Sequence, residues 1–264
     1  MLTIATWNIN SVRLRLPLVL QFLADYAPDI LCLQEIKCPN ELFPREAFVE
    51  AGYPHLAVHG QKGYHGVATV SRLALRDAFS RDYCAVGDTR HLTVTLDREH
   101  GALRLHNFYV PAGGDEPDRA VNPKFGHKLD FVAEMLGLRP GVGGSDVLVG
   151  DLNIAPEEAD VWSSRQLRNV VSHTQIEREA MRSLIERGPW TDLMRHHVGP
   201  DEKLYTWWSY RNRDWKASNR GRRLDHVWGS ADLAARLRGI DVLTHARDWE
   251  KPSEHVPVIA TLDV

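Results

Sequence analysis

Carboxylate, amide and phenol side chains follow several apolar runs of the sequence, at the point where each run ends. Asn8, Glu35 and Tyr109 each end such a run, and Asp151 and Asn153 follow a fourth. Short apolar runs of this kind are typical of buried β-strands. Sites in sheet proteins assemble at strand edges, where a rigid scaffold fixes the groups and the adjoining loops admit a ligand. The pattern therefore predicts that these side chains share one cleft.

Each of these residues also has an ordinary structural interpretation. Asn8 could cap a helix, Tyr109 could be a half-buried strand aromatic, and Asp151 could begin a turn. Glu35 and Asp151, however, both follow strongly apolar runs, where an unpaired buried carboxylate would cost several kcal/mol. We therefore expect a cation to compensate them.

The residue types indicate which cation this is. Cys32, Cys38 and Cys84 form no C-x-x-C motif, and the sequence has no H-E-x-x-H pattern, so soft zinc ligands are not grouped. Carboxylate, amide and water ligands favour a hard ion, with Mg²⁺ first and Mn²⁺ as the alternative. The odd number of cysteines also predicts no disulfide framework.

The elements that must position these groups can be predicted from the apolar pattern. Buried strands are expected at residues 2–6, 30–33, 66–70, 92–96, 103–110, 147–149, 224–228 and 256–262. Helical spacing predicts helices at 12–26, with Ser11 as the N-cap, and at 124–138 and 177–187. Helices alternate with strands near both ends, while residues 54–110 read as consecutive strands. This order predicts two packed mixed sheets with helices outside.

Length and composition agree with a globular protein. A chain of 264 residues with 43% hydrophobic content can bury one large core, so we expect a single domain over residues 1–264. No stretch approaches the roughly 18 to 20 apolar residues of a membrane span. The first residues predict a β-strand instead of a signal segment. We expect a cytoplasmic monomer with no membrane contact.

Six short blocks carry a family resemblance: Thr6-Trp-Asn-Ile-Asn, Leu33-Gln-Glu-Ile-Lys, Asn107-Phe-Tyr-Val-Pro, Gly150-Asp-Leu-Asn-Ile, Arg223-Leu-Asp-His and Ser253-Glu-His-Val-Pro. In this order they resemble the signature blocks of the exonuclease III branch of the endonuclease, exonuclease and phosphatase superfamily. They span nearly the whole chain, which makes the match specific. The resemblance implies a DNase I-like α/β fold, a four-layer sandwich of two packed mixed β-sheets flanked by helices.

The same resemblance implies an activity. It indicates a Mg²⁺-dependent DNA repair nuclease that hydrolyses phosphodiester bonds 5′ to abasic sites, removes 3′ nucleotides and 3′ blocking groups from duplex DNA, or both. The metal group that it implies consists of Glu35 as the principal ligand and of Asn8, Asp151, Asn153, Glu254 and His255.

Catalytic roles are also implied by the resemblance. Asp151 would orient or deprotonate the attacking water, and Asn153 would help to position that water. His255 would stabilise the charge that grows on a phosphoryl oxygen, with Asp225 holding its imidazole through the other ring nitrogen. Tyr109 would hydrogen-bond the phosphate or the leaving oxygen.

The chain departs from the family pattern at two positions. The family usually has Asp before the final His, whereas this chain has Glu254, whose carboxylate stands one methylene further from the backbone. Many relatives carry an amide residue after the Tyr-Val-Pro sequence, whereas this chain has Ala112. The phosphate contact of that amide is therefore absent or supplied elsewhere.

A basic segment predicts DNA binding despite a net charge of -3. Residues 211–223 hold six basic side chains against one acidic, and aromatic residues stand just before them at 207, 208 and 210. Basic groups would follow the phosphates, while aromatic rings would stack on a base or line a pocket for a base-less sugar. The alternative is a solvated loop with tryptophans in the core. The expected contacts within this segment are Arg211, Arg213, Trp215, Lys216 and Arg220.

Four further DNA contacts are expected. By resemblance, Trp207 and Leu224 match positions that shape the abasic-site pocket. Arg222 occupies a position that is often apolar in relatives and would point toward the DNA. Arg90 is expected to add a phosphate contact.

Two other functions remain open from the sequence. The first is another enzyme of the superfamily, acting on inositol phosphates, lipids or RNA, because the shared metal chemistry would keep Glu35, Asp151 and His255. The second is a DNA-binding module without chemistry. The retained carboxylates argue against the second, and the basic segment argues against the first.

Overall fold

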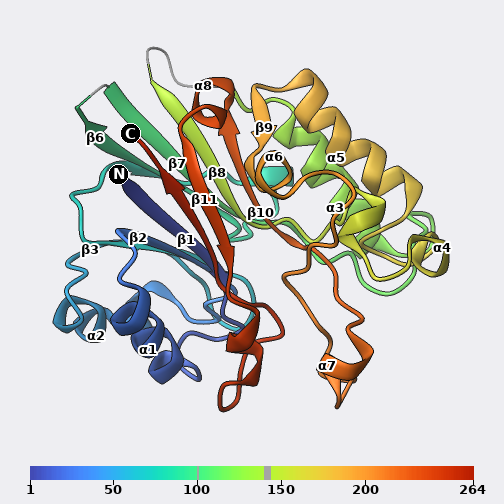
Figure 1. The fold of residues 1–264 in the computed structure, drawn as a ribbon, viewed down its shortest axis with the longest axis horizontal. Coiled ribbons are helices and arrows are strands. Elements are labelled where there is room, and N and C mark those ends of the chain that lie inside the picture. Colours follow the sequence, from blue (N-terminus) through green and yellow to red (C-terminus); the bar gives the residue numbers. More distant parts are fainter. Residues whose placement is uncertain (100, 140–143) are drawn as a thin grey trace.

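The computed structural model describes residues 1–99, 101–139 and 144–264, and two six-stranded β-sheets form its centre (Figure 1). In spatial order the first sheet consists of β11 (Leu237–Val242), β12 (Val258–Leu262), β1 (Leu2–Asn8), β2 (Ile30–Gln34), β4 (Val67–Ser71) and β3 (His55–His59). The second consists of β5 (Arg76–Phe79), β6 (His91–Arg98), β7 (Gly101–Tyr109), β8 (Ser145–Asp151), β10 (Asp225–Ser230) and β9 (Trp190–Asp192). Each sheet is mixed, because β1 pairs with β2 and β7 with β8 in parallel while their other neighbours are antiparallel.

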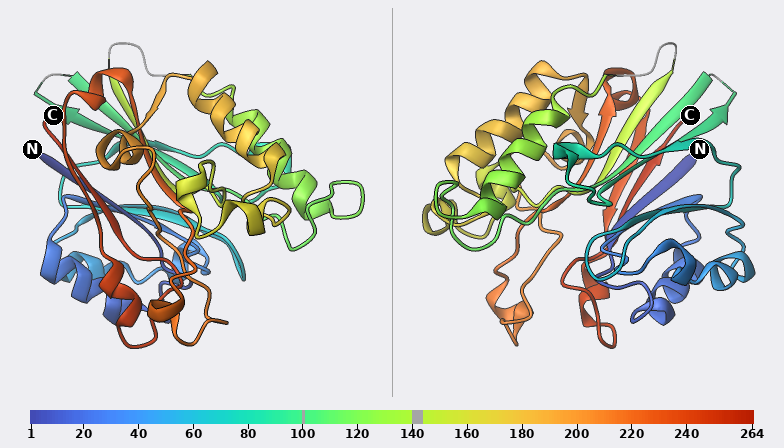
Figure 2. Two further views of the ribbon diagram at one scale, coloured as in Figure 1. Left: turned by 45° about the vertical axis from the view of Figure 1, so that its right-hand side comes forward. Right: turned by 180° about the vertical axis from the view of Figure 1, so that it is seen from behind.

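The helices lie outside the two sheets. They are α1 (Leu16–Tyr26), α2 (Arg45–Glu50), α3 (Pro123–Met135), α4 (Ser164–Leu167), α5 (Gln175–Arg187), α6 (Leu193–Val198), α7 (Trp215–Ser218) and α8 (Ala231–Ala234). Short 3-10 helices are found at Asn40–Leu42, Tyr83–Ala85, Glu158–Asp160 and Thr244–Asp248. Figure 2 shows α1 and α2 against one sheet and α3 and α5 against the other. The expected four-layer α/β sandwich is therefore confirmed.

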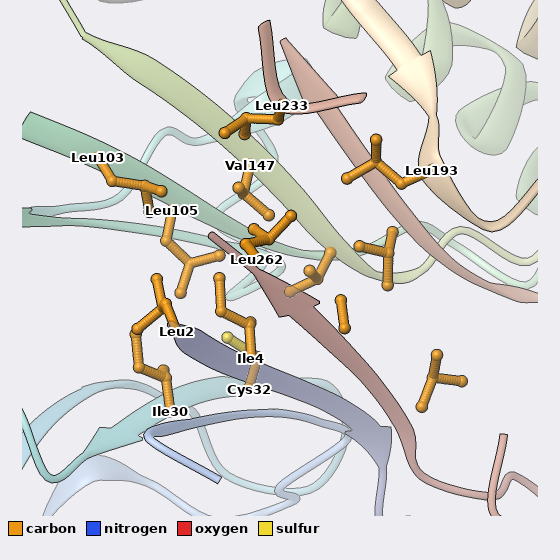
Figure 3. Packing of buried hydrophobic residues seen from close by; sticks show 14 of the residues in the cluster. Leu2, Ile4, Ile30, Cys32, Leu103, Leu105, Val147, Leu193, Leu233 and Leu262 are labelled. Atoms are coloured by element: carbon orange, nitrogen blue, oxygen red, sulfur yellow. The ribbon is translucent and has the colours of Figure 1, made fainter. Parts of the chain in front are cut away.

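Three apolar layers hold these elements together. Side chains such as Ile4, Ile30 and Val147 form the core between the sheets, where Figure 3 shows them interleaved. On the outer face of the first sheet, Phe22 of α1 packs with Trp7 of β1. Phe131 of α3 and Met181 of α5 belong to the corresponding layer over the second sheet. Burial of such apolar surface is the main favourable contribution to folding.

The predicted N-cap of the first helix was wrong. Ser11 has a left-handed backbone with φ 86°, and its N–H donates to the Glu35 carbonyl at 2.7 Å. Residues 9–12 therefore extend the contact with the second strand, and α1 begins only at Leu16, with a proline in its first turn. A proline is well tolerated there because the first N–H groups of a helix have no partner within it.

Two smaller findings complete the description. The three cysteines are all free. Within the described ranges, none of the helices combines the length and the apolar character that crossing a membrane would require.

Candidate active site

Strand periodicity explains why polar residues from distant parts of the sequence meet. Successive side chains of a strand point to opposite faces of the sheet. On β8, Val147 and Val149 lie in the core between the sheets, so Asp151 points to the same side. On β1, Ile4 belongs to this core, and Asn8 shares its face. The inward-facing rows of both strands thus end in polar groups at the same edge of the sandwich.

Strand pairing adds two further groups to this edge. Asp151 is the register partner of Tyr109 in the parallel neighbour β7 and of Asp225 in the antiparallel neighbour β10. Neighbouring residues on one face of a sheet have Cβ atoms about 5 Å apart. The carboxylate of Asp151 is therefore flanked by a phenol and a second carboxylate.

Two site residues stand just beyond strand ends in a left-handed conformation. Glu35 follows β2 with φ 50°, and Asn153 follows β8 with φ 54°. This conformation is uncommon for residues other than glycine and is concentrated at functional sites. Here it turns both side chains toward Asp151, because Asn153 donates to Asp151 and Glu35 shares an amide donor with it.

Hydrogen bonds join the first half of the cluster. Nδ2 of Asn8 donates to Oε1 of Glu35 at 3.0 Å and to Oδ2 of Asp151 at 2.8 Å. The Tyr109 hydroxyl donates to the same Glu35 oxygen at 2.8 Å. The backbone N–H and the Nδ2 of Asn153 donate to the Asp151 carboxylate at 2.9 and 3.1 Å. Every acceptor in this network belongs to Glu35 or Asp151.

The second half of the cluster is a carboxylate–imidazole–carboxylate row. Nδ1 of His255 lies 2.8 Å from Oδ2 of Asp225, and its Nε2 lies 3.6 Å from Oδ2 of Asp151. All three residues are buried. Asp225 thus fixes the ring orientation and leaves Nε2 directed at Asp151.

Proton affinities in the cluster are shifted by burial and neighbouring charge. Burial raises the pKa of Asp151 to about 7, with the Asp225 charge adding to it against the opposing effect of His255. Burial alone would lower the pKa of His255, but Asp225 and Asp151 raise it to about 9. The pKa of Tyr109 is well above its usual value because of burial and then the Glu35 charge. The cluster therefore holds protons near neutral pH, a property typical of functional sites.

Glu35 behaves differently from Asp151. Burial by itself would raise the pKa of Glu35, but the charge of Lys37 and the hydrogen bond from Asn8 hold it below its usual value. Lys37 contributes an ion pair, with its Nζ 2.9 Å from Oε2 of Glu35. Glu35 is therefore an anion at neutral pH.

The donor set fits a hard divalent cation. Asp151, Asp225 and His255 each offer a ligand atom, and these atoms lie within 4.8 Å of one another. The buried Oδ1 of Asp225 has no hydrogen-bond partner within the described part of the chain. Carboxylate oxygens around the Asn8 amide are the ligands that Mg²⁺ and Mn²⁺ prefer. The cluster can therefore bind a metal.

A glycine beside Asp151 is required by the close approach of two strands. Gly150 has φ 141°, and a Cβ built on it would lie 1.9 Å from the carbonyl oxygen of Phe108. Any larger residue would push β8 away from β7 and displace the adjacent carboxylate. Gly150 thus sets the position of Asp151 through the backbone.

The cluster opens into a cavity of about 730 Å³. Its catalytic side includes Glu35, Asp151, Asn153 and His255, and Glu254 lies beside them. Its remaining wall comes from four separate segments, with lining residues Ala112, Gly114, Asp115, Val170, Val171, Ser172, Trp207, Ser209, Tyr210, Arg211, Arg222 and Leu224. A cavity of this size accommodates a small organic group of about a nucleotide's dimensions.

Two of the candidate residues have other partners. Oε1 of Glu254 accepts the Tyr210 N–H at 2.7 Å, so this carboxylate holds the segment after Trp207. Arg90 is buried, with Nε donating to Asp88 at 2.8 Å and the guanidinium 4.9 Å from the Tyr109 ring centroid. The observed contacts of Arg90 therefore support Tyr109.

The candidate DNA contacts fall into two groups. Trp207, Arg211, Arg222 and Leu224 line the cavity. Apart from Arg90, the others belong to the projecting segment around α7, at the lower right of Figure 1, where Arg213, Lys216 and Arg220 are exposed. In this segment Trp215 packs against Trp208, and the Lys216 ammonium pairs with Asp248 at 2.6 Å.

Sequence reasoning missed three residues that hold the site together. The Ser253 hydroxyl donates to the Asn8 carbonyl at 2.7 Å and accepts the His255 N–H at 3.2 Å. The Thr206 hydroxyl accepts the N–H of Asp225 at 3.1 Å. Lys37 and Ser253 lie at the ends of two of the six sequence blocks, and that position is the sequence signal for them.

Comparison with known proteins identifies the family. Residues 5–255 match the Endonuclease/Exonuclease/phosphatase family. The chain belongs to this family. All activities in this family description are hydrolytic cleavages of phosphate esters, so the prediction of a hydrolytic enzyme is confirmed.

Individual members of the family extend the match over the whole chain. Exodeoxyribonuclease III of Haemophilus influenzae is 32% identical, with 97% of each chain covered, which confirms the exonuclease III resemblance. The structure of an AP endonuclease from Archaeoglobus fulgidus superposes with a TM-score of 0.91 at 32% identity, with both chains fully covered. The 3′ phosphatase NExo from Neisseria, bound to a product DNA hairpin, superposes with a TM-score of 0.89 at 34% identity, again with full coverage.

Proposed function

We propose that this family member is a DNA repair nuclease that hydrolyses phosphodiester bonds 5′ to abasic sites and removes 3′ nucleotides or 3′ blocking groups from duplex DNA. The observation that carries the proposal is the joined cluster of Glu35, Asp151 and His255 at the mouth of a cavity lined by Trp207 and Arg222. The named activities of relatives at similar identity, exodeoxyribonuclease III, AP endonuclease and 3′ phosphatase, support it.

The cofactor in this proposal is Mg²⁺, with Mn²⁺ as the alternative. Glu35 is its principal ligand, with Asn8, Asp151, Asn153, Glu254 and His255 completing the group directly or through water. The bound ion would neutralise charge on the phosphoryl oxygens. Support comes from the oxygen-rich donor set and from the ionised state of Glu35.

Asp151 and Asn153 would position and deprotonate the attacking water. With a pKa near 7, Asp151 is suited to accept a proton from water at neutral pH, because a general base works best near the operating pH. Asn153 donates to Asp151 through Nδ2 and so fixes the carboxylate that receives the proton.

Charge stabilisation falls to His255 and Tyr109. With a pKa near 9, His255 carries a proton at neutral pH and can donate from Nε2 to a phosphoryl oxygen, while Asp225 holds Nδ1. The raised pKa of Tyr109 keeps its hydroxyl protonated, so it can donate to the phosphate or to the leaving oxygen.

Duplex DNA is the proposed partner, bound by the basic and aromatic groups beside the cavity. Arg211, Arg213, Lys216 and Arg220 would follow phosphates, and Arg90 would act indirectly through Tyr109. Trp207 and Leu224 would contact the sugar next to the cleaved bond. We further propose that the protein acts as a monomer in the cytoplasm.

The decisive experiment uses end-labelled duplexes, one with an internal abasic analogue and one intact. Incubation with Mg²⁺ should cut the first at the analogue and shorten the 3′ ends of the second, and EDTA should stop both reactions. A soluble inositol phosphate serves as the control substrate. Release of phosphate from it, with both duplexes left uncut, would overturn the proposal.

A further inference from the structure

Arg222 stands in the cavity wall with its guanidinium among apolar side chains. Its guanidinium carbon lies 5.2 Å from the Trp207 ring centroid. Nη1 donates to the Ser172 hydroxyl at 2.7 Å and to the Val171 carbonyl at 3.1 Å. Val171, Trp207, Leu224 and Arg222 all line the catalytic cavity. Without the guanidinium, this part of the wall would be largely apolar.

The backbone fixes Arg222 in this position. Its N–H donates to the Trp207 carbonyl at 3.0 Å, and its carbonyl accepts the Trp207 N–H at 3.0 Å. Trp207 forms a second antiparallel bridge with His255. The segment carrying Trp207 therefore lies between Arg222 and a catalytic residue, so that the side chain of Arg222 is held close to the site of chemistry.

Within the described ranges, the neighbouring arginine has carboxylate partners that Arg222 lacks. Arg223 is fully buried and pairs with Asp160 and Asp192, each at 2.7 Å. Arg222 points to the other side and, among the residues that the structure describes, has no carboxylate within ion-pair distance. Its buried Nε–H also has no hydrogen-bond partner there. A half-buried cation without a carboxylate partner favours an anionic oxygen ligand.

Arg222 also lines two cavities. The catalytic cavity and a neighbouring cavity of about 300 Å³, lined also by Trp162 and Arg220, have Arg222 and Trp207 in common. An apolar side chain shorter than Arg222 would widen the catalytic cavity toward the second one. The size and the charge of Arg222 thus limit which chemical group can bind in the cavity on the far side of the cleaved bond.

We propose that Arg222 makes this active site prefer a terminal 3′-phosphate over an internal abasic linkage. This inference rests on the function proposed above. A phosphate held by Asp151 and His255 in an internal linkage carries a second ester arm, whose sugar must lie against Trp207 and Leu224. Arg222 occupies that space. A terminal phosphate has no second arm, and its additional anionic oxygen can accept a hydrogen bond from the guanidinium of Arg222, which lines the cavity.

Arg222 would interact differently with an internal abasic linkage and with a terminal 3′-phosphate. The base-less sugar is neutral and would have to displace the hydrogen bonds of Arg222 to Ser172 and Val171. The terminal phosphate carries more negative charge than a diester and would gain a charge-assisted hydrogen bond from the guanidinium, with the bonds to Ser172 and Val171 kept. Other charged residues in the wall are Asp115, Glu254 and Arg211, so Arg222 is one of two arginines facing the acidic groups.

The test compares two substrates within one enzyme preparation. The first is a duplex with a recessed 3′-phosphate, and the second is a duplex with an internal tetrahydrofuran abasic analogue. We would measure kcat/KM for both with Mg²⁺, using wild type, Arg222→Leu and Arg222→Lys. The ratio of the two values does not depend on the fraction of folded protein, so a loss of stability cannot imitate the effect.

Arg222→Leu should raise the ratio of abasic incision to 3′-phosphate removal by about tenfold or more, with the two activities moving in opposite directions. Arg222→Lys should fall between Leu and wild type because it keeps the charge and loses the paired Nη1 bonds. Arg220→Leu is the matched control, since Arg220 stacks on Trp162 at 4.8 Å and lines only the smaller cavity. It should weaken both reactions equally.

Two results would overturn the inference. One is an unchanged ratio in Arg222→Leu, and the other is an equal change of ratio in Arg220→Leu. If wild type cleaves neither duplex, the proposed function itself fails and the inference falls with it. Because the first two results require active wild-type enzyme, they are distinguishable from the third.

Discussion

Asp160 and Asp151 are both buried carboxylates in the same half of the sandwich, but the chain gives them different partners. Asp160 accepts from the guanidinium groups of Arg223 and Arg195, and these charges outweigh burial and lower its pKa to about 2. Asp151 has only amide donors and the His255 ring, and burial raises its pKa to about 7.

This difference separates structural from chemical carboxylates. Asp160 is neutralised within the fold, so it ties the segment around residue 160 to the strand that begins at Asp225. In the described part of the chain, Asp151 has no arginine or lysine partner, so a proton or a divalent ion can still neutralise its charge. Of these two buried carboxylates, the one without an arginine partner keeps a raised pKa and belongs to the candidate site.

The largest effect should come from Asp151→Asn. This change removes the proton acceptor and keeps the shape, so turnover of an abasic duplex should fall by at least about a thousandfold. Binding of the duplex, measured by fluorescence anisotropy, should persist. Unchanged turnover would reject the role of Asp151.

Asp160→Asn should produce the opposite pattern. It leaves Arg223 and Arg195 without their shared carboxylate, and breaking a buried ion pair destabilises a protein by about 3–5 kcal/mol. Urea unfolding should show that loss of free energy, while kcat per folded molecule stays within a few-fold of wild type. A large loss of kcat with normal stability would contradict the comparison.

Metal binding should also distinguish the candidate site from the Asp160 ion pairs. At a Mg²⁺ or Mn²⁺ concentration about 100 times the Kd, wild type should gain about 2.7 kcal/mol of unfolding free energy. Glu35→Gln should lose most of this gain, whereas Asp160→Asn should keep it above its own lower baseline. Equal stabilisation of Glu35→Gln and wild type would remove Glu35 from the metal group.

Acid should act on the Asp160 cluster. Its folded-state pKa of about 2 lies below the ordinary 3.8, so its contribution is complete above pH 3.8 and is lost as pH falls through 2. The loss amounts to about 2 kcal/mol. Urea unfolding at several pH values below 5 should show a steeper decline in wild type than in Asp160→Asn.

Rising pH should act on the Asp151 cluster in the opposite direction. Its folded-state pKa of about 7 lies above 3.8, so its contribution is complete below pH 3.8 and is lost as pH rises through 7. With EDTA present, wild type should lose stability between pH 4 and 7 relative to Asp151→Asn. Identical pH profiles for the two proteins would contradict the raised pKa.

The apolar pattern was sufficient to predict the strands that carry the site, but not the sheet edges. β1, β2 and β8 are largely apolar because both of their faces are covered, whereas β7 alternates Leu103 and Leu105 with Arg104 and His106; both patterns are distinctive. The edge strand β5 is exposed along its whole length and has no apolar pattern. The three-residue strand β9 is too short for a period to be recognised.

The site was predictable to a similar degree. The site residues at the strand ends could be predicted because a polar residue directly after a run of apolar residues is easy to recognise in the sequence. The sequence could not predict that the side chains of Arg222 and Arg223 point to opposite sides, because the acidic partners of Arg223 lie far away in the sequence. The bond between Glu254 and the Tyr210 N–H likewise depends on how a distant loop folds back.

The tight contact at Gly150 has a genetic consequence. Since even one extra carbon there would collide with the Phe108 carbonyl, no codon change that alters this amino acid would be silent in function. In a saturation library selected for survival of DNA damage, the position should tolerate substitution as little as Asp151 does. Substitution at this point of the backbone is therefore closed to evolution, whichever side chain is tried.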